Sequence, residues 1–175
     1  MKLNANSGLL KHGKPLKLGG FLPYRLSILS NRVSGEISRL YVDRFGISVP
    51  EWRVIAILGE QKASHEAEEA RAMTSTQVAQ RTAMDKVAVT RAVQQLSRKG
   101  FVQREASQQD RRVAFLSLSA TGWDVYREIA PLALEYESEL LEILNPAERK
   151  HLDDIMAKLH QRLDALDASA LAGVE

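Results

Sequence analysis

The sequence contains no cysteine among its 175 residues. Disulfides, thiolate catalysis and zinc sites that need cysteine are therefore excluded. No apolar run approaches the roughly 20 residues of a membrane-spanning helix. The first twenty residues also lack the apolar core of a signal peptide, so we expect a cytoplasmic protein. With 45% hydrophobic residues, a chain of this length can form one ordinary domain with a sizeable core.

The common signatures of enzymes are also missing. The chain has no Ser–His–Asp order with a nucleophile turn, no Gly-rich phosphate loop and no metal-ligand spacing. Its four histidines, His12, His65, His151 and His160, are scattered along the sequence. They are expected to be solvated rather than to bind a metal. We therefore expect no enzyme, no catalytic residue and no metal site.

Charge is distributed unevenly along the chain. Residues 71–112 contain nine Lys and Arg against three acidic residues, a net charge of +6, whereas residues 135–175 have a net charge of −6. This asymmetry indicates a basic surface for a polyanion in the middle of the chain. Two solvated surfaces of chance composition would give the same numbers, so composition alone leaves both explanations open.

Hydrophobic periodicity predicts a mainly α-helical protein with one β-hairpin. Spacings of three and four between apolar residues mark helices, and two short apolar runs around a polar turn mark the hairpin. Thr74 with Gln77, and Asn145 with Glu148, match helix-capping boxes. The helices are expected at 22–45, from 48–50 onward, and at 74–82, 85–99, 119–144 and 146–166, with strands at 101–105 and 113–118.

This order of elements is typical of a winged helix-turn-helix, over about residues 74–118. In that fold a helix enters the major groove of DNA and meets the base edges with its exposed side chains. The predicted helix at 85–99 buries Val89, Val93 and Leu96. Its opposite face then carries Lys86, Thr90, Arg91, Gln94, Gln95 and Arg98.

The members of this face have different expected roles. Arg91 and Gln94 lie in its middle and are the best candidates to read bases, while Lys86, Thr90 and Arg98 are better placed for phosphates. The hairpin tip adds candidates for the minor groove, with Asp110 expected to hold an arginine in place. These tip residues are Gln108, Gln109, Arg111 and Arg112.

One alternative is a protein-interaction module that uses a winged helix without DNA. The combination of Arg91 and Gln94 with the two tip arginines argues against it, because such a module has little need for both sets. A thiol sensor is excluded by the absence of cysteine, and the histidine spacing gives no support to a metal sensor.

Two stretches of the sequence resemble the MarR family. The first runs from Asp110 to Gly122 (DRRVAFLSLSATG) and is similar to the wing pattern of that family. The second comprises Asp85–Val93 (DKVAVTRAV) and Leu96–Val102 (LSRKGFV), which resemble its recognition helix and the turn into the wing. The resemblance covers about residues 22–165. A segment around 62–71 makes this chain longer than the family norm, and its role is open.

The resemblance implies a homodimeric regulator, in most cases a repressor, that binds a pseudo-palindromic operator in double-stranded DNA. Residues 21–48 and 119–168 would form the helical dimerisation region, 49–118 the DNA-binding lobe and 1–20 a flexible arm. The apolar content of the first, fifth and sixth predicted helices agrees, because one small winged domain cannot cover them all.

The resemblance also implies a small effector, often an aromatic anion, that releases the DNA. Residues 21–31 and 49–53 are similar to a subgroup that senses hydroxycinnamoyl-CoA and related aromatic acyl-CoA thioesters. Tyr24, Ser30, Asn31 and Trp52 would then line an aromatic pocket. Arg25, Arg32 and Arg53 would meet a carboxylate or phosphates, although the same residues also fit core packing and surface ion pairs.

Overall fold

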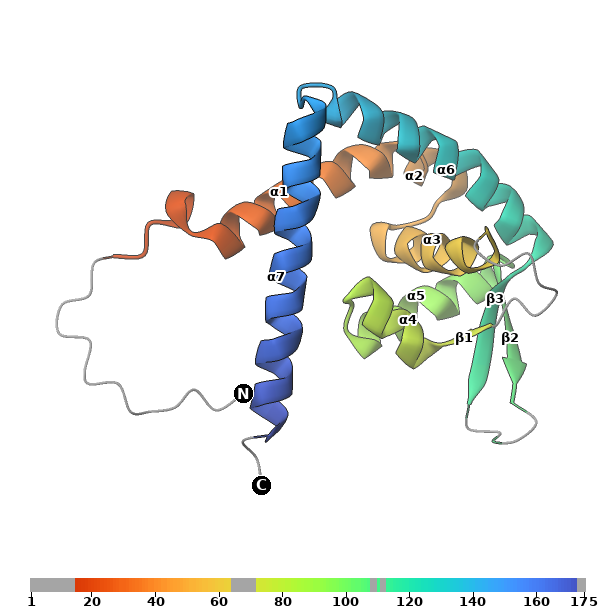
Figure 1. Ribbon diagram of the computed structural model, residues 1–175. Helices are drawn as coiled ribbons and strands as arrows, with labels where there is room; N and C mark the ends of the chain where they lie inside the picture. Colours follow the sequence, from red (N-terminus) through yellow and green to blue (C-terminus); the bar gives the residue numbers. More distant parts are fainter. Residues whose placement is uncertain (1–14, 64–71, 108–109, 111–112, 173–175) are drawn as a thin grey trace. The chain divides into compact units, whose positions relative to one another are not determined.

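A computed structural model describes residues 15–63, 72–107, 110 and 113–172 of the chain (Figure 1). The described residues divide into two compact units: those between 25 and 136 belong to one, which we call the 25–136 unit, and residues 15–24 with 137–172 belong to the other. The elements, in chain order, are η1 (Leu18–Gly20), α1 (Leu22–Arg39), α2 (Val42–Phe45), α3 (Val49–Ala63), β1 (Met73–Thr74), α4 (Ser75–Thr82), α5 (Lys86–Arg98), β2 (Val102–Ala106), β3 (Ala114–Leu118), α6 (Ala120–Leu141) and α7 (Pro146–Ala172).

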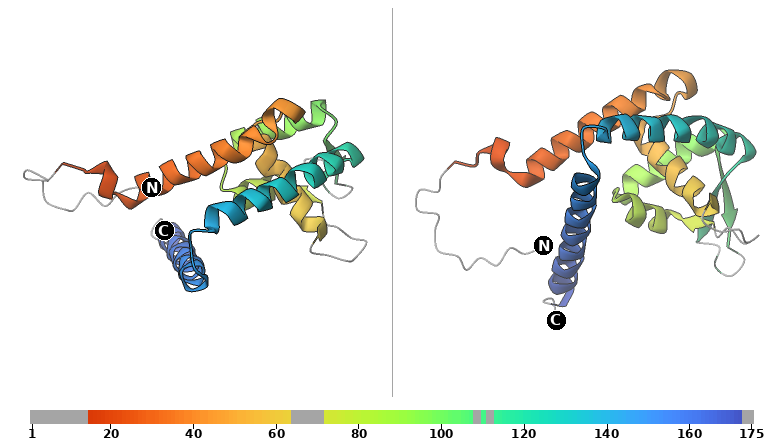
Figure 2. Two further views of the ribbon diagram at one scale, coloured as in Figure 1. Left: turned by 90° about the horizontal axis from the view of Figure 1, so that it is seen from above. Right: turned by 45° about the horizontal axis from the view of Figure 1, so that its top comes forward.

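The 25–136 unit is built around the packing of α3, α4 and α5 on a small sheet. Figure 1 shows α4 and α5 next to each other and against α3, and the strands stand at one end of these helices there and in the right-hand view of Figure 2. The core side chains come from all these elements, and Val54, Val78, Val89, Leu96 and Leu116 are fully buried. The predicted mainly helical winged helix-turn-helix is confirmed.

Local capping determines where the two short helices begin. The Thr74 hydroxyl accepts the N–H of Gln77 at 3.2 Å, and the Gln77 side chain accepts the N–H of Thr74 at 2.8 Å, so the predicted capping box is present. Asp85 accepts the N–H groups of Val87 and Ala88 at 2.9 and 2.8 Å and so caps α5. Between them Ala83 takes the left-handed conformation, with φ 52°, which turns the chain from α4 into α5.

The sheet has three antiparallel strands in the order β1-β3-β2. Val102 pairs with Leu118 and Ala106 with Ala114, which forms the predicted hairpin. The sequence did not predict β1, in which Met73 pairs with Leu116 and Thr74 with Phe115. A strand of two residues has no periodicity of its own, and it exists only because β3 offers a free edge.

The single helix predicted over residues 22–45 is wrong. Helix α1 ends at Arg39, and the N–H groups of Leu40 and Tyr41 donate to the carbonyls of Ile37 and Ser38, three residues back. This tighter turn lets Tyr41 enter the core, where its side chain is 1% exposed, before α2 begins. Gly46, with φ 62°, ends α2.

The start of α6 joins the base of the wing. The Ser119 hydroxyl donates to the Gly100 carbonyl at 2.6 Å and accepts the N–H of Gly122 at 3.0 Å. Ser119 therefore caps α6. The helix ends at Leu141 rather than Leu144, and Pro131 lies inside it.

The other unit contains α7, which begins at the predicted capping box. Asn145 and Glu148 exchange hydrogen bonds of 2.9 and 3.0 Å between backbone N–H groups and side chains. The helix continues to Ala172, beyond the predicted end at Leu166, because the alanine-rich segment from Ala165 favours helix. Among the residues that the structure describes, no helix is long and apolar enough to cross a membrane.

Candidate nucleic-acid interface

Helix α5 separates its apolar and polar residues onto opposite sides. Val89, Ala92, Val93 and Leu96 are buried in the core of the 25–136 unit. The six side chains predicted for DNA are all exposed, and we refer to them as the α5 polar face: Lys86, Thr90, Arg91, Gln94, Gln95 and Arg98. The structure thus brings these six predicted residues onto one accessible helix surface.

The α5 polar face is electrostatically one-sided. No acidic residue occurs from Lys86 to Arg104, a stretch that contains five Lys and Arg. Asp85, just before it, uses its carboxylate oxygen to accept two backbone N–H groups at the helix start. The surface therefore offers cationic and amide hydrogen-bond donors of the kind that bind phosphates and purine edges.

The Thr90 hydroxyl, predicted to contact a phosphate, already has a hydrogen-bond partner in the helix. It donates to the carbonyl of Lys86 at 2.7 Å, within the same helix. To donate to a phosphate, Thr90 would first have to give up that bond. Its methyl group is the part that can contact a neighbouring molecule without any such loss.

The hairpin tip falls partly outside the described residues. Gln108, Gln109, Arg111 and Arg112 lie outside them, so their predicted contact with the minor groove stays a prediction. The neighbouring backbone closes the turn, since Ser107 N–H donates to the Val113 carbonyl and Val113 N–H donates to the Asp110 carbonyl, both at 2.9 Å.

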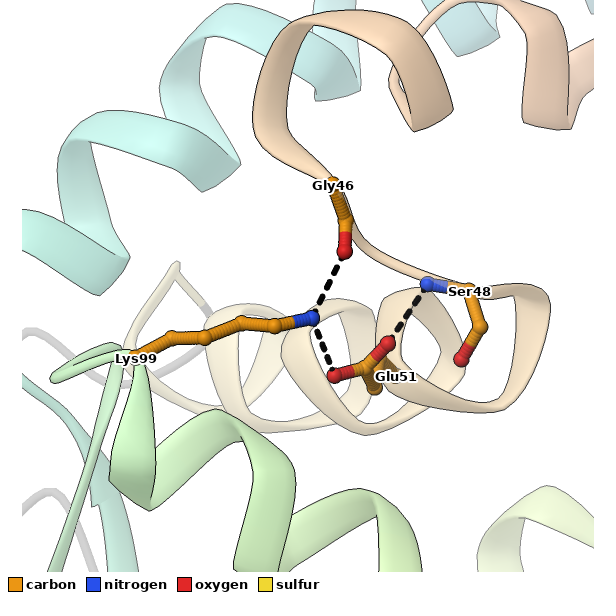
Figure 3. A network of polar contacts seen from close by, with 4 residues as sticks. All are labelled: Gly46, Ser48, Glu51 and Lys99. Atoms are coloured by element: carbon orange, nitrogen blue, oxygen red, sulfur yellow. Dashed lines mark hydrogen bonds and ion pairs between the residues drawn. The ribbon is translucent and has the colours of Figure 1, made fainter.

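A polar network that the sequence did not reveal connects the end of α5 to the start of α3 (Figure 3). The Lys99 ammonium donates to the Gly46 carbonyl and to Glu51 Oε1, both at 2.6 Å. Glu51 Oε2 accepts the N–H of Ser48, also at 2.6 Å. We call these four residues, Gly46, Ser48, Glu51 and Lys99, the Lys99 network.

The Lys99 network holds a buried charge. Burial alone would raise the pKa of Glu51, but the hydrogen bonds from Lys99 and Ser48 and the positive charge of Lys99 outweigh it and keep that pKa below its ordinary value. A Ser-x-x-Glu pattern at 48–51 was a local signal for part of the network. Lys99 lies 48 residues further on, and no local signal pointed to it.

The residues predicted to bind an effector do not form one described cluster. Trp52 is half-buried in an aromatic stack, with its ring centroid 5.6 Å from Tyr41 and 6.3 Å from Tyr126. Burial raises the pKa of Tyr41 to about 12, with a smaller opposing effect of Arg53. Tyr24 belongs to the other compact unit. The remaining predicted residues are exposed on α1 and α3: Arg25, Ser30, Asn31, Arg32 and Arg53.

The fold and the α5 polar face define a winged helix-turn-helix protein with an accessible basic helix. Residues 45–113 match the sequence model of the MarR family. The transcriptional repressor MprA of Escherichia coli K12 is 32% identical over 78 residues, which are 45% of this chain and 44% of MprA. The chain thus aligns with about half the length of the curated relatives it matches.

Solved structures resemble the chain over most of its length. A MarR/EmrR family regulator from Acinetobacter sp. ADP1 has a TM-score of 0.72 and 25% identity, covering 86% of this chain and 99% of that one. Sco3205 from Streptomyces coelicolor, solved in complex with DNA, has a TM-score of 0.70 and 21% identity, covering 87% of this chain and 92% of Sco3205. PcaV from the same organism, solved with its natural ligand, has a TM-score of 0.68 and 16% identity. That match covers 85% of this chain and 98% of PcaV. In sequence over residues 45–113, and in fold over most of its length, the chain is therefore similar to transcriptional regulators of the MarR family.

Proposed function

We propose that this chain is a repressor of transcription that binds a pseudo-palindromic operator in double-stranded DNA as a homodimer. The observation that carries the proposal is the α5 polar face: six exposed polar or cationic side chains on a helix whose other side buries four apolar ones. A helix of this kind fits the major groove with its donors toward the bases and phosphates. Such a protein acts where the DNA is, in the cytoplasm.

The comparisons support this proposal in two respects. Sco3205, which has the same fold, was solved in complex with DNA. MprA, which is 32% identical to this chain over 78 residues, is a transcriptional repressor. A duplex reader held by phosphate contacts should lose affinity steeply as salt rises.

Exposed apolar side chains on the terminal helices support the homodimer. Leucine and isoleucine side chains on α1 and α7 are about half exposed in the single chain, which is costly in water unless another surface covers them. A second copy would cover them by two-fold symmetry and present two α5 helices to one duplex. These residues are Leu22, Leu26, Ile28 and Leu29 on α1, and Leu152, Ile155, Leu163 and Leu166 on α7.

Replacing Arg91 with alanine should weaken specific DNA binding by about 1–3 kcal/mol, because a bidentate contact to a purine edge is lost. The operator is first obtained by random-site selection and by testing the DNA upstream of the gene. Affinity is then measured by fluorescence anisotropy at two salt concentrations. Sedimentation of the complex should give two protomers per operator.

Arg127→Ala is the matched control for this experiment. Arg127 is an exposed arginine of α6 that pairs with Asp124 at 3.2 Å, so its loss removes the same charge outside the α5 polar face and should change affinity little. Equal affinity of the Arg91→Ala variant and the wild type would contradict the proposed docking. Failure to select any DNA sequence would favour the protein-interaction module instead.

We further propose that a small aromatic acid or an aromatic acyl-CoA thioester, such as a hydroxycinnamoyl-CoA, releases the DNA. PcaV, which has the same fold, was solved with its natural ligand. The half-buried ring of Trp52 offers an aromatic surface, and Arg25, Arg32 and Arg53 offer exposed cations for a carboxylate or phosphates. A ligand that prefers the DNA-free arrangement shifts the population away from DNA.

Calorimetric titration with a panel of aromatic acids and their CoA thioesters tests the effector. We expect one compound of the panel to give heat of binding, and the same compound to abolish the anisotropy shift with operator DNA. Absence of heat with every thioester would refute the acyl-CoA proposal, whereas binding without loss of the shift would show that the ligand does not control DNA binding.

A further inference from the structure

One exposed residue of α5 is apolar, although its exposed neighbours on the helix are polar or cationic. Val87 is 58% exposed, whereas the other two valines of the helix, Val89 and Val93, are at most 2% exposed. Thr90, Arg91 and Gln94 follow Val87 by three, four and seven positions, so they share its side of the helix. Val87 is therefore an apolar side chain within the surface that carries the proposed base readers.

The position of Val87 is fixed before any ligand arrives. It lies in the first turn of α5, where its N–H donates to Asp85 Oδ1 at 2.9 Å. A β-branched side chain in a helix has essentially one χ1 rotamer. Because neither its backbone nor its side chain has much freedom to lose, Val87 can be buried against a partner at little entropic cost.

Thr90 extends the apolar character of this spot. Its hydroxyl is occupied by the carbonyl of Lys86 at 2.7 Å, which leaves its methyl group as the part available for contact. Val87 and Thr90 are neighbours one turn apart. Together they offer aliphatic carbon in a face that otherwise offers cations and amides.

We propose that Val87, supported by the Thr90 methyl, recognises the 5-methyl group of a thymine in each half-site of the operator. This inference rests on the proposed DNA-binding function and adds a specificity determinant to it. Thymine is the only base that presents an apolar group on its major-groove edge. Against any other base, Val87 would cover polar atoms without bonding them, which is unfavourable.

The proposal also places the thymine relative to the other bases read. Val87 is at the start of α5, and Arg91 and Gln94 follow along the same side. The thymine is therefore expected next to the purine that Arg91 or Gln94 contacts. A helix that combines an aliphatic contact with a bidentate donor discriminates two adjacent base pairs by different chemistry.

Replacing thymine by deoxyuridine, which lacks only the methyl group, tests the contact directly. Each thymine of the selected operator is exchanged in turn, and the affinity of the full chain is measured by fluorescence anisotropy. One exchange per half-site should weaken wild-type binding about fourfold, the value expected for one buried methyl group. Val87→Ala removes the contact from both half-sites of the dimer, so it should bind the original operator about sixteenfold more weakly than the wild type, about fourfold for each contact. It should also be insensitive to that same exchange.

Leu16→Ala is the matched control, because Leu16 is an exposed aliphatic residue of the N-terminal arm, outside α5 and outside the predicted dimerisation region. It should bind like the wild type and keep the full sensitivity to deoxyuridine. The inference is overturned if no exchange affects the wild type, or if Val87→Ala loses as much affinity on each exchange as the wild type does. Failure to select any DNA overturns the proposed function itself, which is a separate outcome from binding that ignores the methyl groups.

Discussion

Gly122→Ala should destabilise the protein by about 3 kcal/mol, at the upper end of what overpacking usually costs. A Cβ atom at position 122 would lie 2.0 Å from the carbonyl oxygen of Phe101 and 3.0 Å from its carbonyl carbon. Both are backbone atoms, so no side chain can rotate to make room. The backbone at 122 is not left-handed, which means that glycine is needed here for closeness and not for conformation.

Any movement that relieves this clash would also weaken the hydrogen bonds around Gly122. The Phe101 carbonyl accepts the N–H of Ser119 at 3.0 Å, and the Ser119 hydroxyl bonds both to the Gly100 carbonyl and to the Gly122 N–H. If the start of α6 moves away from Phe101, these bonds lengthen together. The base of the wing would then lose its attachment to α6.

Gly35→Ala provides the control. Gly35 lies within α1 and has no atom within 4 Å of the position its Cβ would take. Alanine there should stabilise the helix by about 0.5–1 kcal/mol, because glycine is a poor helix former. Urea unfolding of both variants gives the two free energies, and a Gly122→Ala variant as stable as the wild type would disprove the close approach.

Gly122 also illustrates what the sequence could and could not reveal. The pattern from Asp110 to Gly122 identified the family resemblance, but it gave no reason for a glycine at that point. The reason is the carbonyl of Phe101, 21 residues earlier in the chain. Contacts of that range leave no periodic signal.

Features encoded by neighbouring residues were predicted well. The capping boxes at Thr74 and Asn145 and the buried side of α5 all depend on groups within a few positions of one another. The features that the sequence failed to predict depend on contacts with residues far away in the chain. Strand β1 depends on β3, and the break before α2 depends on a core that accepts Tyr41.

The predicted effector residues show a second limit. A tryptophan at a helical position of mixed polarity fits both a ligand pocket and a packed core, and the sequence pattern is the same. In the structure the ring of Trp52 lies between Tyr41 and Tyr126. Packing between these two rings is sufficient to explain a tryptophan at this position.

The second large effect is expected in the Lys99 network. Lys99→Met keeps the aliphatic stem and removes the ammonium, so Glu51, whose side chain is 6% exposed, keeps a charge without its ionic partner. Breaking a buried ion pair from one side costs about 3–5 kcal/mol. The Lys99 side chain is 30% exposed, so water already screens part of its interaction with Glu51. We therefore expect Lys99→Met to lower the free energy of unfolding by about 2–3 kcal/mol at pH 7.

Glu51→Gln should lower the free energy of unfolding by less than Lys99→Met does, by about 1–2 kcal/mol. Both carboxylate oxygens of Glu51 accept hydrogen bonds, one from Lys99 and one from Ser48. Glutamine has a single oxygen, so one of the two donors would face an amide NH₂ group. The ammonium of Lys99 would still bond to the Gly46 carbonyl. The control is Glu36→Gln, which removes an exposed pair with Arg39 and should change stability little.

The pH dependence separates a charge effect from a packing effect. The pKa of Glu51 is lowered in the folded protein, so its ionised form adds stability that is fully present above the unfolded value of about 4.3 and is lost as the pH falls through the folded pKa. The gap between the wild type and Glu51→Gln should therefore be widest near pH 7 and should shrink below about pH 4. In Lys99→Met the carboxyl is buried without its cation, which raises its pKa, so that variant should gain relative stability on acidification. Urea unfolding at a series of pH values measures both gaps, and gaps that stay constant with pH would mean that Lys99 acts through its packing alone.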